Sequence, residues 1–153
     1  MKIFASVEFA EDASRQSPGR VKGRLLRYGD VTNRGETFAP GSLSWDESGI
    51  ILNLQHQRTE PLTRFTPMTS GDDLLVDLAL PNTQRGRDTA LLLREGVYTG
   101  LSAEAHILAE HVKDGVTVFE QAQLVGASLV DRPAFPKSVL MEKRGGLFWE
   151  PWL

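Results

Sequence analysis

The sequence predicts an α+β domain dominated by an antiparallel β-sheet or barrel, with one or two helices. Short apolar or alternating runs bounded by turn residues recur along the chain, which is typical of strands. Only one long segment changes to a helical period. The chain has 153 residues, 41% of them apolar and 24% charged, as in an ordinary globular protein. We therefore expect a single domain with a substantial core.

The first quarter of the chain contains one predicted strand. Residues 11–20 are rich in polar residues, Gly and Pro and predict a loop. Residues 21–28 come next, with a β-like mixture of apolar and basic side chains. The turn at 38–42 predicts the start of a short helix through Leu43 and Trp45.

Two apolar strands come next. The predicted short helix stops near Gly49, and Ile50–Leu54 is an apolar run that predicts a buried strand ending at Gln55 and His56. Leu74–Leu80 predicts another strand, closed by Pro81.

The helical period appears after these strands. We expect Asn82 to cap a helix from about Arg85 to Arg94, with Leu92 and Leu93 directed inward and Gly96 ending it.

Three further strands are predicted after the helix. They cover residues 97–108, 117–122 and 124–130, and Pro133 and Pro136 then end the strand pattern.

Composition excludes several classes of function. The net charge of −3 argues against a protein that binds nucleic acid mainly through phosphates. The absence of cysteine excludes disulfides, thiolate zinc sites and a Cys nucleophile. No apolar run approaches the ~20 residues of a membrane span. The segment Met1–Glu8 turns acidic too early for a signal peptide, so we expect a soluble intracellular protein.

Ser102 is the candidate nucleophile. Around it the apolar residues alternate with Ser102, Glu104 and His106. On a strand this pattern gives one apolar face and one face bearing a hydroxyl, a carboxylate and an imidazole. The alternative is a solvated strand face, and the pattern alone favours that alternative.

The three histidines offer a base but no metal site. His56 ends a core strand, where a rigid backbone suits a general base, although a surface His is the more common case there. His106 and His111, with Glu104 and Glu110, offer metal-ligating groups. However, residues five apart on a strand lie on opposite faces, so the metal interpretation is weak. No phosphate-binding loop or Gly-x-Ser-x-Gly elbow occurs.

The order of segments resembles a known family. Six segments occur along the chain in the family's order: Phe38–Leu43, the strand ending in His56, Leu74–Leu80, the helix ending at Leu91–Gly96, Gly100-Leu101-Ser102, and Ala127–Phe135. From about Val21 to Val139 the chain is similar to the HK97-type prohead (capsid maturation) serine proteases of tailed phages.

This resemblance implies a fold and an activity. The fold is an antiparallel β-barrel, distantly similar to herpesvirus assemblin, with one or two flanking helices. The activity is that of a serine endopeptidase, without cofactor or metal, that cuts scaffold and major capsid protein segments inside the immature prohead in the host cytoplasm. A homodimer or higher oligomer is compatible with it, and no nucleic-acid or membrane partner is expected. The aromatic tail 141–153 is expected to dock on the barrel or on a partner.

Site residues carry over from the family by position. His56 corresponds to the general base and Ser102 to the nucleophile of the Gly-Leu-Ser motif. The oxyanion site of assemblin-like enzymes falls at Asp131 and Arg132, where Arg132 acts through its backbone or a bound water.

Two departures from the family concern the base. Gln55-His56-Gln57 replaces an Asn-His-Asp-like context. The acidic residue that commonly stands two positions before Ser-Leu-Val is Gly126 here, whereas Glu104 stands where the family usually has a small residue. Glu104 shares a strand face with Ser102, ~6.8 Å further along. Our hypothesis is that Ser102, His56 and Glu104 form the triad.

Three alternatives remain open from the sequence. In the first, Glu104 is simply solvated. In the second, which Gly126 favours, the chain is an inactive homologue that acts as a structural or assembly partner of the capsid. In the third alternative the chain is a small β-barrel binding module that uses Trp45 and other aromatics, although a core role suits these aromatics better.

Overall fold

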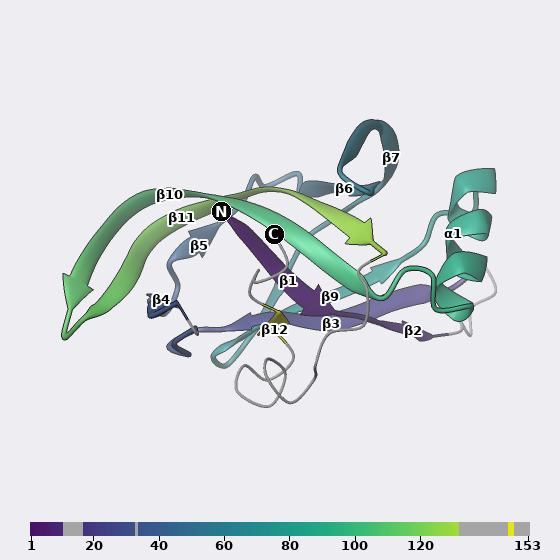
Figure 1. The fold of residues 1–153 in the computed structure, drawn as a ribbon. Helices are drawn as coiled ribbons and strands as arrows, with labels where there is room; N and C mark the ends of the chain where they lie inside the picture. The colour runs from purple at the N-terminus through teal and green to yellow at the C-terminus, as the bar shows by residue number, and fades with distance from the viewer. Residues whose placement is uncertain (11–16, 33, 132–146, 149–153) are drawn as a thin grey trace.

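The chain folds into two β-sheets packed face to face, with a helix at one end (Figure 1). The computed structural model describes residues 1–10, 17–32, 34–131 and 147–148. The elements formed by these residues are β1 (Lys2–Ser6), β2 (Glu8–Ala10), β3 (Arg20–Arg27), β4 (Glu36–Phe38), β5 (Leu43–Ser44), β6 (Ile50–Leu54), β7 (Gln57–Phe65), β8 (Met68–Ser70), β9 (Asp73–Ala79), α1 (Gln84–Arg94), β10 (Gly100–Lys113), β11 (Val116–Val130) and β12 (Leu147–Phe148).

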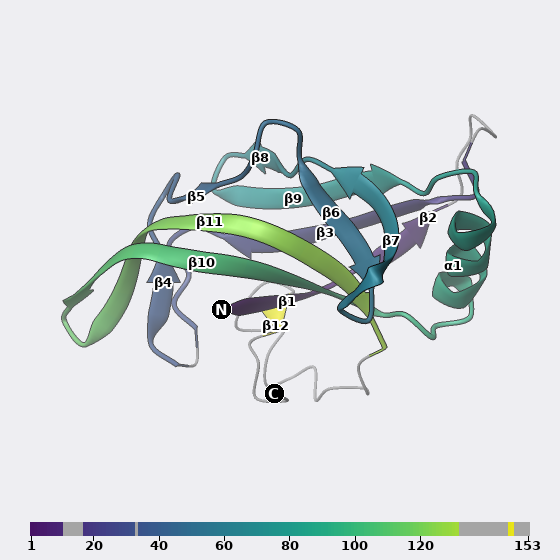
Figure 2. The same ribbon diagram turned by 90° about the horizontal axis from the view of Figure 1, so that it is seen from above.

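The larger sheet is built around the long antiparallel hairpin of β10 and β11. Its strand order is β12-β1-β10-β11-β6-β7, and β4 and β5 also pair with β11. β11 runs parallel to β4, β5 and β6, so this sheet is mixed rather than antiparallel. In both views the hairpin arches across the molecule, and its turn projects beyond the other strands (Figures 1 and 2).

The smaller sheet is antiparallel, in the order β2-β3-β9-β8. The core lies between the sheets. Buried apolar side chains such as Val21 and Val76 from the smaller sheet join Leu52, Ala103 and Leu129 from the larger one in a single cluster. Full burial of one such large side chain contributes about 1.5–3 kcal/mol. The core therefore fixes the face of β10 that carries Ala103, and with it the opposite face that carries Ser102.

The predicted closed barrel is not confirmed. Among the described residues neither sheet closes on itself, and the fold is mainly β with one mixed and one antiparallel sheet. Strand alternation looks the same for parallel and antiparallel neighbours, so the pattern could not reveal that β11 pairs in parallel on one side.

The helix is confirmed, with two corrections. Thr83, not Asn82, is the N-cap: its side chain accepts from the Gly86 N–H at 3.0 Å. The side chain of Asn82 instead accepts from the Arg87 guanidinium at 3.0 Å. Leu93 is buried as predicted, but Leu92 is 36% exposed.

The end of the helix agrees with prediction. Glu95 is its C-cap, and Gly96 comes next with φ +75°, in the left-handed region that favours glycine.

Three strand boundaries differ from prediction. Leu43–Ser44 forms strand β5 beside Ala122 and Gln123, so the short helix expected through Leu43 and Trp45 is wrong. The strand expected from residue 97 begins at Gly100. The two strands expected at 117–122 and 124–130 are one, because Gln123 breaks the apolar pattern without breaking the backbone pairing.

The tail is described only at Leu147–Phe148, which forms β12 and pairs antiparallel with Phe4 and Ala5 of β1. This dipeptide therefore docks on the edge of the larger sheet. The rest of the tail 141–153 lies outside the described residues, as do Pro133, Pro136 and most of the loop predicted at 11–20.

Candidate active site

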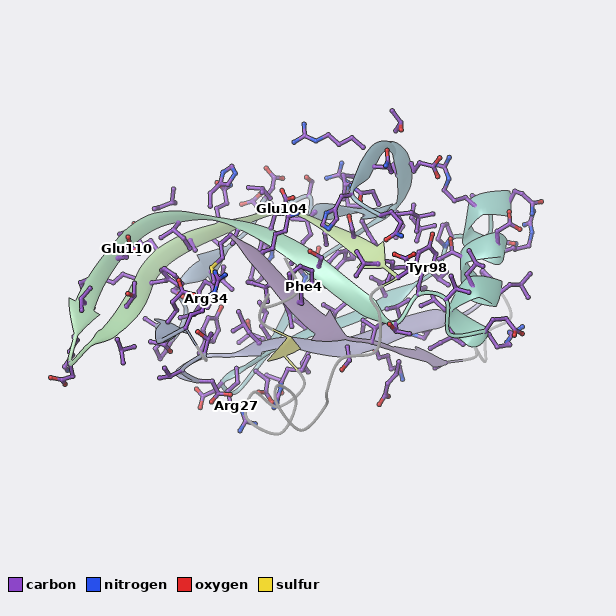
Figure 3. All side chains as sticks on the ribbon, viewed as in Figure 1. Phe4, Arg27, Arg34, Tyr98, Glu104 and Glu110 are labelled. Atoms are coloured by element: carbon purple, nitrogen blue, oxygen red, sulfur yellow. The ribbon has the colours of Figure 1, made fainter. Side chains whose placement is uncertain are left out.

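A groove of about 480 Å³ crosses β6, β10 and β11 on the larger sheet. Ser102 and Glu104 of β10 line it, together with Ser128 of β11 and His56. Glu104 points from the side of β10 that faces away from the smaller sheet (Figure 3). The groove thus brings together the predicted nucleophile, base and third member.

His56 lies in a tight turn rather than on a strand. Gln55 and His56 connect β6 to β7 and have φ of 52° and 59°. Two central residues with positive φ are typical of a type I′ hairpin turn, which usually contains Asn or Gly. His56 and Ser102 do not come from neighbouring strands, because β11 separates β6 from β10.

The groove contains two serine hydroxyls with different surroundings. Ser102 pairs directly with Ser128 across the hairpin, and both are buried. The Ser128 hydroxyl accepts from the His56 N–H at 3.1 Å and donates to Asn53 Oδ1. The Ser102 Oγ has no hydrogen-bond partner among the described residues. Ser102 is therefore the hydroxyl whose proton and lone pairs are uncommitted.

The carboxylate of Glu104 lies beside the His56 ring. Its Oε1 is 3.9 Å from His56 Nδ1, and the side chains are 43% and 29% exposed. This separation is longer than a direct hydrogen bond but within the distance that one water or a small rotation closes. The other ring nitrogen, Nε2, is buried. A carboxylate at Nδ1 leaves Nε2 for a proton exchange with a hydroxyl.

The predicted oxyanion region is only partly described. The Asp131 N–H donates to Gln55 Oε1 at 3.2 Å, and the Gln55 side-chain amide donates to the Asp131 carboxylate. Burial raises the pKa of the nearby Tyr98 hydroxyl, and the carboxylates of Asp131 and Glu60 raise it further. Arg132 lies outside the described residues.

The remaining histidines do not form one site. His106 is exposed and lines the groove, whereas His111 contacts the Glu120 carboxylate further along the hairpin. The described part of the chain contains no group of three metal-ligating side chains placed to hold an ion.

Four residues of the site were not predicted: Asn53, Gln55, Arg58 and Ser128. Asn53 is the one polar residue within the apolar run Ile50–Leu54, and Ser128 is the one within Ala127–Val130. A lone polar residue in a buried strand needs a hydrogen-bond partner, and that signal was available in the sequence.

One of three comparisons with known proteins identifies a family. A family model described as caudovirus prohead serine protease matches residues 6–146. The chain belongs to this family. No curated protein and no solved structure matches it significantly.

Family membership confirms the predicted resemblance and has three consequences. It implies serine protease activity, a role in capsid maturation with capsid proteins as partners, and action in the immature capsid within the host cell. In the described residues, no helix combines the length and the apolar character that crossing a membrane requires.

The resemblance puts an acidic residue at the position of Gly126, and the structure shows where this position lies relative to Glu104. Glu104 and Gly126 are directly paired across the hairpin. A Cβ added to Gly126 would meet no atom within 4 Å, so the space above it is open. The carboxylate and the glycine thus occupy facing positions on neighbouring strands, each next to the groove.

Proposed function

We propose that the chain is a serine endopeptidase that cuts scaffold and major capsid protein segments during prohead maturation. Ser102 is the nucleophile, His56 the general base and Glu104 the third member of the triad. The observation that carries this assignment is the 3.9 Å separation of Glu104 Oε1 and His56 Nδ1 in the groove that Ser102 also lines. Family membership supplies the substrate class.

The reaction is an acyl transfer. The Ser102 Oγ forms a bond to the scissile carbonyl carbon while its proton passes to His56 Nε2. Glu104 stabilises the resulting positive charge at Nδ1. The amine product leaves with the proton from His56, and a water activated by the same imidazole then hydrolyses the ester.

The Ser102 hydroxyl is closed off from water, since the residue is 0% exposed. A substrate must therefore displace the outer side chains of the groove before the carbonyl reaches Oγ. Exclusion of water strengthens the electrostatic interactions of the site. The oxyanion contact is assigned to the Asp131–Arg132 stretch on the basis of the family resemblance. To donate to an oxyanion, the Asp131 N–H must first leave Gln55.

Labelling with a fluorophosphonate probe tests the proposal, because the reaction needs an activated serine. We expect the probe to modify wild-type protein at Ser102, located by mass spectrometry of peptides. Ser102→Ala should remain folded, stay unlabelled, and leave the co-expressed major capsid protein uncut. Ser44→Ala, in a remote strand, is the matched control and should behave like wild type.

The same experiment distinguishes the protease from the second candidate function. Gly126 at the family's usual acidic position favours an inactive homologue that serves as an assembly partner. A folded wild-type protein that the probe does not label supports that role and contradicts the protease proposal.

A further inference from the structure

The turn that carries His56 is held in a conformation that its residues disfavour. Both Gln55 and His56 have positive φ, and neither is Gly, Asn or Asp. Such backbone costs of order 1–3 kcal/mol per residue and persists only where surrounding contacts impose it. The contacts on this turn therefore determine where the imidazole lies.

Ser128 and Leu129 of β11, and Asp131 directly after this strand, supply those contacts. The Leu129 carbonyl accepts from the Gln55 N–H at 2.9 Å. The Gln55 side chain is bound to the main chain and carboxylate of Asp131. Ser128 contacts His56 itself, by accepting from its N–H at 3.1 Å. Of these three residues, Ser128 thus acts most directly on the catalytic base.

The Ser128 hydroxyl has a fixed direction. It is 1% exposed, and its proton is donated to Asn53 Oδ1. With the proton directed at Asn53, a lone pair remains for the His56 N–H. Asn53 and Ser128 are also register partners in the parallel ladder of β6 and β11, so the backbone keeps them together.

We propose that Ser128, oriented by Asn53, is a positioning residue that aims His56 at Ser102. This role rests on the proposed function, since it acts through the base of that triad. Ser128 is also the cross-strand partner of Ser102. One residue therefore fixes the base through its side chain and the nucleophile through its backbone ladder, and sets their relative positions.

The kinetic experiment measures the rate constant and the binding constant of fluorophosphonate inactivation separately. In Ser128→Ala we expect the maximal inactivation rate to fall about 10- to 100-fold, with probe affinity unchanged within twofold, because a misplaced base slows chemistry without removing binding contacts. Ser128→Thr keeps the hydroxyl and should retain most of the rate. Asn53→Ala should reproduce the Ser128→Ala defect, and the double variant should be less impaired than the product of the two effects.

The control separates positioning from stability. Thr89→Val removes another buried hydroxyl that donates a hydrogen bond, 2.7 Å to the Arg85 carbonyl in α1, remote from the groove. It should lower Tm to a similar extent without altering the inactivation rate. If Ser128→Ala reacts at the wild-type rate, or if Thr89→Val slows the reaction equally, the positioning role is wrong.

A readout independent of catalysis distinguishes this inference from the protease proposal. The His56 amide proton should exchange slowly with solvent in wild type and Ser102→Ala, and at least tenfold faster in Ser128→Ala. Unaltered exchange in Ser128→Ala contradicts the inference even if Ser102 is reactive. An unlabelled wild type with the expected exchange pattern contradicts the protease proposal, and then Ser128 positions no catalytic base.

Discussion

The two halves of the β10–β11 hairpin are both antiparallel, but they differ in the regularity of their pairing and in their surroundings. Residues 100–104 with 126–130 lie over the core, where Leu101 is 1% exposed. Beyond Glu104 the register shifts at three places and the hairpin curves away, and Val112 is 70% exposed. Such irregularities bend and twist a strand pair. The first of them comes directly after Glu104, so the regular part of the hairpin ends at the last residue of β10 in the proposed triad.

Each half of the hairpin has a glutamate with a histidine beside it, although His56 belongs to the turn between β6 and β7. His56 lies near Glu104 in the groove, and His111 contacts Glu120 on the projecting half. The second pair has side chains 44% and 49% exposed and is far along the strand from Ser102. Proximity of these two residue types therefore does not define a site. The groove pair differs because it has a nearby uncommitted hydroxyl and a base held by buried contacts.

The largest effect on the labelling rate is expected from removing the Glu104 carboxylate that lies beside His56. Glu104→Gly should lower the rate of fluorophosphonate labelling by about 10³- to 10⁴-fold, the scale of losing the carboxylate of a serine protease triad. Adding Gly126→Glu to this variant should raise its labelling rate at least tenfold, because the two positions face each other and the space above Gly126 is open. If Glu104→Gln reacts at the wild-type rate, the Glu104 carboxylate takes no part in the mechanism.

The second prediction compares stability in the two halves. Leu101→Ala should lower the free energy of unfolding by about 2–5 kcal/mol, because it leaves a cavity in the core. Val112→Ala should change it by less than about 0.5 kcal/mol, since the side chain is already in water. Urea denaturation of both variants measures the difference. Equal losses would mean that the projecting half is packed against something in solution.

The smallest effect is expected for the second His–Glu pair. Glu120→Gln should leave the labelling rate unchanged within twofold and stability within about 0.5 kcal/mol, because exposed ion pairs contribute little. Labelling kinetics and thermal unfolding of this variant, measured beside Glu104→Gln, sharpen the contrast. A labelling defect in Glu120→Gln would extend the site onto the projecting half.

Local sequence patterns predicted the individual helix and strands better than they predicted which strands pair with one another. Ile50–Leu54 and the helix before Gly96 were recognised because the apolar run and the stop are encoded within a few residues, although the N-cap is Thr83 and not the predicted Asn82. The pairing of Leu43–Ser44 with β11 depends on residues nearly eighty positions away, so a turn followed by apolar residues was mistaken for a helix. Parallel pairing and an unclosed sheet are likewise long-range properties.

Three side chains of the candidate site were named from the sequence, but the contacts that hold the Gln55–His56 turn in place were not. Ser102, Glu104 and His56 were found from strand alternation and family order, and the structure places them around one groove. The left-handed turn at Gln55 and His56 was not expected, because positive φ is uncommon in residues other than glycine. It arises from contacts with Ser128, Leu129 and Asp131, which no local pattern connects to it.

The direct pairing of Glu104 with Gly126 constrains the order in which an active enzyme can exchange one arrangement for the other. Two substitutions separate them, so a stepwise change passes through a chain with either two glycines or two glutamates at these positions. The first intermediate has no carboxylate for the base. The second keeps one throughout, and like charges facing each other across strands cost only about 0.2–1 kcal/mol. Under the proposed triad, a carboxylate stays beside His56 throughout only on the path on which the new acid is gained before the old one is lost.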